Sequence, residues 1–182
     1  MTAAETGLFE RQLAGRASLL EFGCGGSTVV AARRVPTIVS VDSNSEWLTK
    51  VGTDPAVAAR AFTPFYADIG PVGEWGHPID DTRIRDWPRY HAAVWRHIKG
   101  SPDVVLLDGR FRVACALQAL IHAKPDTVLL FHDFADRPQY HVVLRHMEVV
   151  ERADTLAVLR PRADLDGKAV LHDLFDHFLI AD

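Results

Sequence analysis

The chain has 182 residues, of which 48% are hydrophobic and 24% charged, a composition typical of one globular domain. Its formal net charge of −4 makes a nucleic-acid partner unexpected, and no apolar run approaches the roughly 20 residues that cross a bilayer. Neither cysteine lies in a C-x-x-C pattern, which argues against a disulfide framework or a structural zinc site. We therefore expect a single domain over residues 1–182 in the cytoplasm, with no signal peptide and no membrane partner.

A glycine-rich turn follows the first predicted strand. Residues from about Glu5 to Leu13 favour a short amphipathic helix, residues 18–22 form an apolar run, and three glycines fall within residues 23–26. Glycine permits a tight turn and a close approach of backbone to a ligand, and the following helix would offer free N–H groups. The match to the dinucleotide pattern G-x-G-x-x-G is partial, because Thr28 stands at the third glycine position. We interpret the turn as a binding device, with a turn of no ligand significance as the alternative.

The second predicted strand, residues 37–42, ends on an acid. Asp42 lies 19 positions after Gly23, close to the spacing of roughly 20 expected of a ribose-binding acid in nucleotide folds. A carboxylate there can accept hydrogen bonds from both ribose hydroxyls. In the alternative interpretation Asp42 caps the helix predicted over about residues 45–51, a role for which Ser43 competes.

A weaker strand and an irregular insert come next. Residues 61–67 contain Pro64, which favours a strand at the edge of the sheet. Residues 70–88 hold three glycines, three prolines and two tryptophans, so neither a helix nor a buried strand is expected. This insert is either a cover for an active site, to which Trp75, His77 and Trp87 contribute, or a surface loop pinned by its aromatic side chains.

Two further buried strands are predicted, and both end in polar residues. The strand before Asp108 is followed by a helix over residues 113–124, and the strand over residues 126–131 leads into His132 and Asp133. Arg110 and Arg112 precede the intervening helix, where a cation opposes the helix dipole. They are either solvated arginines or residues that contact an anion or substrate.

In the C-terminal part, the sequence pattern predicts a helix from Tyr140, two short strands over residues 148–152 and 155–159, and a terminal helix. Before these, a helix beginning at Pro88 carries His91 on its apolar face, where a packed core histidine is expected. The expected packed face of the terminal helix is Leu171, Leu174, Phe175, Phe178 and Leu179. Its His172, Asp173, Asp176 and His177 are interpreted as exposed pairs rather than a metal site.

Strands alternate with helices along the whole chain, which indicates an α/β protein with a mostly parallel sheet. In such a sheet ligands bind at the carboxyl ends of the strands. We therefore expect one edge of the sheet to gather the polar residues that follow the strands, namely Glu21, Asp42, Asp108, His132 and Asp133.

The stretch Glu21-Phe22-Gly23-Cys24-Gly25-Gly26 resembles the first motif of class I S-adenosylmethionine-dependent methyltransferases, and residues 103–109, D-V-V-L-L-D-G, resemble the variable catalytic motif of that family. The resemblance implies a doubly wound, Rossmann-like, seven-stranded sheet with helices on both faces, closed by an antiparallel pair. It implies S-adenosylmethionine as cofactor and S-adenosylhomocysteine as product. The implied cofactor-binding residues are Glu21, Gly23, Cys24, Gly25, Ser27 and Thr28 in the turn, Asp42 at the ribose, the neighbouring Ser43, and Asp68 and Ile69 at the adenine.

Methyl transfer is an in-line displacement in which the protein orients the nucleophile and manages its proton. We expect Asp108, His132 and Asp133 to be the catalytic residues, acting on a small-molecule substrate. Asp108 and Asp133 also resemble the acids of cation-dependent O-methyltransferases, so a magnesium ion is an alternative, although His132-Asp133 stands where that group has Asp-Asn. Two other functions stay open: an NAD-dependent oxidoreductase, which the missing third glycine disfavours, and a methyltransferase-like module without catalysis. Aminopropyltransferases share the fold, but no paired acids suit a polyamine.

Overall fold

The computed structural model describes residues 1–182 and is built on a seven-stranded sheet of order β3-β2-β1-β4-β5-β7-β6. The pairings β3-β2-β1-β4-β5 are all parallel, whereas β7 runs antiparallel to both β5 and β6. The predicted fold class and the antiparallel closing pair are therefore confirmed. The strands are β1 (Ser18–Phe22), β2 (Thr37–Asp42), β3 (Ala61–Tyr66), β4 (Val104–Leu107), β5 (Val128–Phe131), β6 (Met147–Ala153) and β7 (Leu156–Pro161).

The register of the parallel strands brings their carboxyl ends to one level. Phe22, the last residue of β1, pairs with Val41 of β2 and with Leu107 of β4, and Leu107 pairs with Phe131 of β5. The turns that follow these four strands consequently begin side by side. β3 lies at the edge as Pro64 predicts, because an edge strand tolerates a residue without an N–H.

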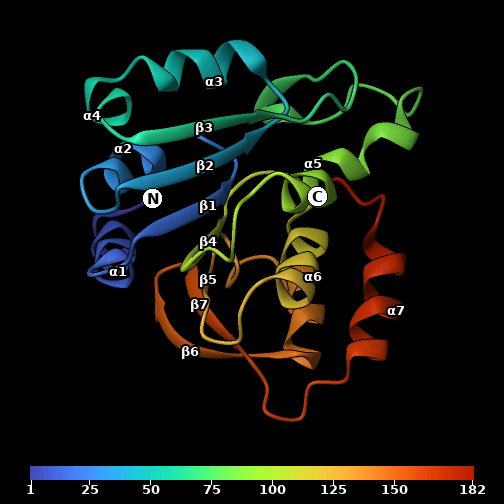
Figure 1. Ribbon diagram of the computed structural model, residues 1–182. Helices are drawn as coiled ribbons and strands as arrows, with labels where there is room; N and C mark the ends of the chain where they lie inside the picture. The colour runs from blue at the N-terminus through green and yellow to red at the C-terminus, as the bar shows by residue number, and fades with distance from the viewer.

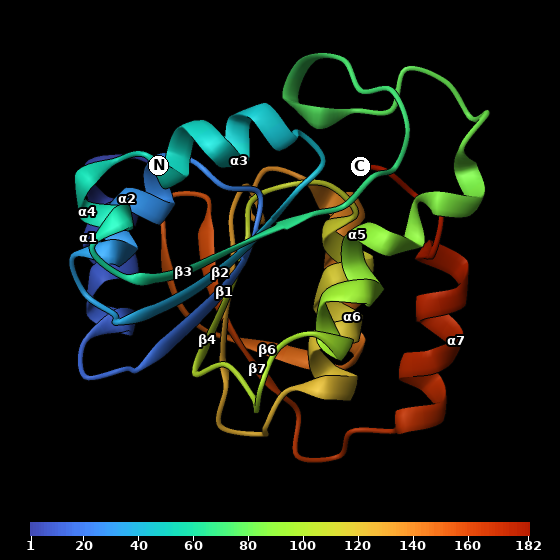
Figure 2. The same cartoon turned by 45° about the horizontal axis from the view of Figure 1, so that its top comes forward.

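Helices cover both faces of the sheet (Figures 1 and 2). One face packs against α1 (Ala3–Leu13), α2 (Gly26–Ala32), α3 (Ser45–Gly52) and α4 (Pro55–Ala58). The other packs against α5 (Pro88–Ala92), α6 (Arg112–His122) and α7 (Gly167–His177). The longest of these helices have 11 residues, and none is long and apolar enough to cross a membrane.

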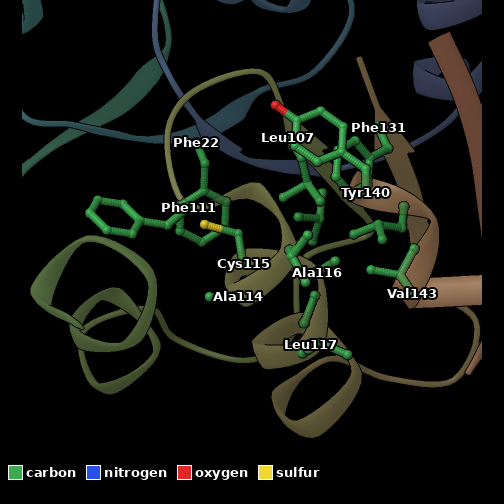
Figure 3. Close-up of a cluster of buried hydrophobic side chains, with 14 of the residues drawn as sticks. Phe22, Leu107, Phe111, Ala114, Cys115, Ala116, Leu117, Phe131, Tyr140 and Val143 are labelled. Atoms are coloured by element: carbon green, nitrogen blue, oxygen red, sulfur yellow. The ribbon is translucent and has the colours of Figure 1, made fainter. Parts of the chain in front are cut away.

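The two cores follow from the alternation of side chains along each buried strand. Leu19, Val104 and Leu106 belong to a cluster of 18 buried residues under α1 to α4. Their neighbours Leu20 and Leu107 belong to a cluster of 26 buried residues on the opposite face. Figure 3 shows part of this second cluster, where Phe22, Leu107 and Phe131 lie close to Ala114, Cys115, Ala116 and Leu117 of α6.

Two predicted helices differ in form from the expectation. The segment after Pro88 is a short α-helix followed by a 3₁₀ turn over Ala93–Arg96, and the segment around Tyr140 is a 3₁₀-helix over Pro138–Arg145. His91 is fully buried, and its Nε2 lies 3.0 Å from the carbonyl oxygen of Phe178, so the prediction of a packed core histidine is confirmed. Burial lowers the pKa of His91 to about 4, which keeps the ring neutral at pH 7.

The packed face of α7 was predicted correctly only in part: Leu174 and Phe178 pack against the core as expected. Leu171 and Phe175 are exposed, Phe175 by 74%, whereas Val170 and Leu174 are buried against the core. Asp173 is also buried and accepts hydrogen bonds from Arg145 and His146, so it is not one of the exposed residues that were expected. The remaining pair is exposed as predicted, with His172 Nδ1 3.6 Å from Asp176 Oδ2.

Candidate active site

A cavity of about 950 Å³ opens at the carboxyl ends of β1, β2, β4 and β5. Its walls come from the turns after these strands, from the N-terminal helix and from the insert over residues 70–88, which extends past this edge of the sheet in Figure 2. The residues that line it include Met1, Gly23, Cys24, Gly25, Ser27, Asp42, Ser43, Trp47, Trp75, His77, Asp108, Arg110, Arg112, His132, Asp133 and Arg137. Nine of the thirteen residues predicted for the site are therefore gathered in one place.

The turn after β1 lies directly against the turn after β4. Gly23 has φ of +90°, a conformation that favours glycine, and a Cβ added to it would lie 2.7 Å from the backbone of Asp108 and Gly109. A Cβ on Gly109 would in turn lie 2.1 Å from Tyr90 Oη and 2.8 Å from Gly23 N. The two glycines thus allow backbone to touch backbone and bring the cavity's two halves together.

Glu21 lies behind the glycine turn, not in the cavity. Its carboxylate is fully buried and accepts hydrogen bonds from the hydroxyls of Ser27, Thr28 and Ser40. Burial raises the pKa of Glu21 to about 7, although these hydrogen bonds oppose that rise. Thr28 is buried as well, and its hydroxyl accepts a hydrogen bond from Gly25 N at 2.9 Å. Glu21 and Thr28 therefore hold the shape of the turn from beneath.

Asp42 faces the cavity from the end of β2. One carboxylate oxygen accepts from Cys24 N at 3.1 Å and the other from Asn44 N at 2.9 Å. The cap of α3 is Asn44, which accepts from Trp47 N, so neither Asp42 nor Ser43 serves as the cap. No cation lies within ion-pair distance of Asp42, which leaves its charge directed towards the cavity.

Cys24 is buried in the turn. Burial and the neighbouring Asp42 and Glu21 carboxylates raise the pKa of Cys24 well above its usual range, so it is no nucleophile at neutral pH. Trp47 Nε1 donates to the carbonyl oxygen of Cys24 at 2.7 Å and so fixes the turn from the side of α3.

Asp68 and Ile69 do not line the cavity. Asp68 is partly exposed and pairs with Arg83 at 3.3 Å, whereas the side chain of Ile69 is buried in the core. The structure therefore does not bring these two residues together with the rest of the predicted cofactor site.

An ion-pair network joins the turns after β4 and β5. His132 Nδ1 lies 2.8 Å from Asp108 Oδ1, and Arg112 reaches both Asp133 Oδ2 at 3.0 Å and Asp108 Oδ1 at 3.6 Å. Arg112 also donates to the carbonyl oxygens of Gly109 and His132 at 2.9 and 2.6 Å. No contact occupies Asp108 Oδ2, which is the oxygen left for a ligand.

Glu5 of the first helix completes this network. Its Oε2 lies 3.2 Å from His132 Nε2, so the imidazole stands between two carboxylates. Burial opposes the charge on His132, but Asp108, Asp133 and Glu5 outweigh it and raise the pKa of the imidazole. Burial likewise opposes the charge on Glu5, yet hydrogen bonds from Thr155, Thr2 and His132 lower the pKa of Glu5 to about 2.

Asp108, His132 and Asp133 each place a ligand atom within 4.8 Å of the others, the spacing of a metal site. Magnesium prefers oxygen ligands and nearly ideal octahedral geometry. Here one of the three groups is an imidazole, and both carboxylates already pair with Arg112 or His132. This donor set does not favour the magnesium alternative, because a divalent cation would have to displace cations that the fold itself supplies.

Each of the two interpretations of the insert, an active-site cover and a loop pinned by aromatic side chains, fits one part of it. Trp75 and His77 line the cavity, as a cover would, and Trp75 is 87% exposed. Trp87 instead packs on Phe111, with ring centroids 5.8 Å apart, and anchors the insert to the core.

Several residues of the site were not predicted, notably Glu5, Trp47 and Arg137. The sequence carried a signal only for Arg110 and Arg112, whose charges oppose the helix dipole. Both arginines are buried, so their interpretation as solvated side chains is wrong. No comparable signal marks Glu5, because it meets His132 only through the fold.

Comparison of the sequence with protein-family models and with curated proteins gave no match. Among solved structures, a methyltransferase-like protein from Silicibacter pomeroyi is 33% identical, with a TM-score of 0.87 over 99% of this chain and 96% of that chain. The chain therefore belongs to the family of class I S-adenosylmethionine-dependent methyltransferases.

Two more distant structures share the fold. An O-methyltransferase from Bacillus cereus, solved in complex with S-adenosylhomocysteine, is 10% identical, with a TM-score of 0.59 over 89% of this chain and 82% of that chain. The O-methyltransferase TomG from Streptomyces achromogenes, solved with S-adenosylmethionine, is 15% identical, with a TM-score of 0.60 over 90% and 82%.

Proposed function

We propose that this protein is an S-adenosylmethionine-dependent methyltransferase that acts on a small molecule. The observation that carries the proposal is the convergence of the glycine turn, Asp42 and Asp108 on one cavity. Its volume of about 950 Å³ is that of small-molecule sites in general. Membership of the methyltransferase family adds independent support.

The cavity's β1–β2 wall fits the cofactor. Gly23 and Gly25 expose backbone, Ser27 adds a hydroxyl, and the unpaired Asp42 carboxylate retains lone pairs for ribose hydroxyls. Cys24 and Ser43 complete this wall, and we assign Glu21 and Thr28 to holding the turn in shape. An adenine-contacting role for Asp68 and Ile69 stays a prediction, because neither residue lines the cavity.

The chemistry assigned to the β4–β5 wall is proton management. The cofactor, when bound, supplies a methyl group activated by its sulfonium. We assign to Asp108 the acceptance of the proton from the attacking nucleophile, since Asp108 Oδ2 has no ion-pair partner in the cavity. His132 and Asp133 keep the Asp108 carboxylate in one orientation, directly and through Arg112.

The test begins with calorimetric titration of S-adenosylmethionine, S-adenosylhomocysteine and NAD, followed by a methyl-donor turnover assay on metabolite pools. Asp108→Asn should bind S-adenosylhomocysteine as wild type does and lose at least about a hundredfold of turnover, the usual contribution of a general base. Asp176→Asn, an exposed carboxylate on α7, is the matched control and should change neither quantity. Unchanged turnover in Asp108→Asn would refute the assigned role, and binding without any turnover would favour the non-catalytic module.

A further inference from the structure

Arg110 lies at the wall of the cavity with almost no partners. It follows Gly109 after β4 and is only 7% exposed. A guanidinium carries five N–H donors. The one side-chain contact that Arg110 makes is from Nη1 to His77 Nε2 in the insert, and its buried Nε has no partner at all.

The charge of Arg110 is not compensated within the protein. No carboxylate lies within 4.0 Å of it, whereas Arg112, two residues further on, pairs with both Asp108 and Asp133. His77 supplies no counter-charge, because a guanidinium only donates and His77 Nε2 must therefore accept. Burial and the charges of Arg110 and Arg137 also lower the pKa of His77, which keeps its ring neutral.

A buried charge without a partner is costly, and proteins rarely keep one that nothing neutralises. Arg137, the third arginine of the cavity, pairs with Asp133 at 3.1 Å. Arg110 is thus the one arginine in the cavity whose counter-charge is missing, and its position at the wall lets a ligand supply that charge. The planar fork of a guanidinium matches a carboxylate or a phosphate group.

We propose that Arg110 binds an anionic group, a carboxylate or a phosphate ester, of the small molecule held in the cavity. This inference rests on the proposed function in that the anion belongs either to the methyl acceptor or to the amino-acid part of the cofactor. Both sources share one recognition chemistry, and they are separated by probes that carry or lack the anion.

The experiment compares Arg110→Gln with Arg85→Gln, a substitution that removes the same charge from an exposed arginine of the insert. S-adenosylhomocysteine and 5′-methylthioadenosine, which lacks the carboxylate, are titrated calorimetrically. Inorganic phosphate and succinate are then titrated against free protein and against protein saturated with S-adenosylhomocysteine, with thermal stability as the readout at constant ionic strength.

If the cofactor is the source, Arg110→Gln should weaken S-adenosylhomocysteine about tenfold or more, the effect of losing one charge-assisted hydrogen bond, and leave methylthioadenosine unchanged. If the acceptor is the source, Arg110→Gln should instead abolish the stabilisation by phosphate or succinate that wild type and Arg85→Gln show. Equal behaviour of Arg110→Gln and Arg85→Gln towards every probe overturns the proposal.

Failure of the proposed function is recognised separately. A protein that binds neither adenosyl compound is not a methyltransferase, but the phosphate and succinate titrations of the free protein still decide whether Arg110 binds anions. Arg110→Gln is expected to fold, because it removes an uncompensated charge, and its thermal midpoint should equal or exceed that of wild type. Should Arg110→Gln not fold, Arg110→Lys replaces it, because lysine keeps the charge but loses the planar fork of the guanidinium. Arg110→Lys should bind S-adenosylhomocysteine, or phosphate and succinate, measurably more weakly than wild type does, and wild-type affinity for all of them refutes the proposal.

Discussion

The two halves of the cavity wall treat charge in opposite ways. At the ends of β1 and β2, Glu21 and Asp42 are held only by hydroxyl and backbone N–H donors. At the ends of β4 and β5, Asp108 and Asp133 are paired with Arg112 and His132. The first half therefore leaves the charge of Asp42 for a ligand to meet. In the second half the carboxylates are paired internally and held in fixed positions, and Arg110 alone keeps a charge without a partner.

The largest effect is expected at the contact between the two halves, where Gly23 meets the backbone of Asp108 and Gly109. Gly23→Ala should lower the free energy of unfolding by about 3–5 kcal/mol, because the new Cβ would meet the backbone of Asp108 and Gly109 and Gly23 has positive φ. Urea denaturation measures the loss. Gly26→Ala, where a Cβ meets nothing within 4 Å, should stay within about 1 kcal/mol of wild type. Similar costs for both variants would show that the two halves are not in contact.

The next largest effect on stability is expected from removing Arg112, which pairs with the carboxylates at the ends of β4 and β5. Arg112→Leu leaves Asp108 without its arginine, Asp133 with Arg137 alone, and the carbonyl of Gly109 without a donor, which should cost on the order of 3 kcal/mol of unfolding free energy. The control is Arg11→Leu, which breaks an exposed pair with Glu151 and should cost about 1 kcal/mol or less. Equal losses in chemical denaturation would mean that the network does not depend on Arg112.

Glu21, which has no cationic partner at the end of β1, should make the stability of the protein depend on pH. Because the pKa of Glu21 is raised from 4.5 to about 7, the folded state keeps a proton that the unfolded chain has lost. The stability contributed by this group is full below pH 4.5 and is lost as the pH rises through about 7. Glu21→Gln should therefore gain on wild type over this window, by on the order of 2 kcal/mol.

Glu5 works in the opposite direction, since its pKa is lowered from 4.5 to about 2 and its contribution is lost as the pH falls through that range. Denaturation curves at several pH values for wild type, Glu21→Gln and Glu46→Gln separate the two effects. Glu46 is exposed, so its variant should track wild type at every pH. A constant difference between Glu21→Gln and wild type across the window would contradict the assignment.

The smallest expected effect concerns the brace on the glycine turn. Trp47→Phe removes the indole N–H that donates to the carbonyl of Cys24 and should cost about 1 kcal/mol. Because the turn belongs to the proposed cofactor wall, S-adenosylhomocysteine should also bind several-fold more weakly by calorimetry. Loss of stability without loss of affinity would confine Trp47 to a structural role.

Local sequence patterns predicted most of the fold. The apolar β-branched run of β2 has the predicted bounds, Thr37–Asp42, and Pro64 marks an edge strand. Part of the face of α7 was missed because both stripes of that helix are apolar, and periodicity alone does not say which of Val170 and Leu171 meets the core. The alternation of strands and helices was sufficient to bring Asp42, Asp108 and His132 to one edge.

What the sequence could not supply were pairings between distant residues. Arg112 is buried where it meets Asp133, and Asp68 pairs with Arg83 outside the cavity. Burial of an arginine depends on partners that only the folded chain provides. The unfavourable position of Arg110 and Arg112 at a helix N-terminus therefore marked them as unusual but did not predict that they are buried.

Both ends of the described chain adjoin the cavity. Met1 lines it, and Asp182 Oδ1 accepts a hydrogen bond from Arg112 N at 2.9 Å. A purification tag or reporter domain joined at Met1 or Asp182 would begin beside the cavity, where its own charges could enter the opening. Biochemical assays of this protein should accordingly use a chain from which added residues have been cleaved.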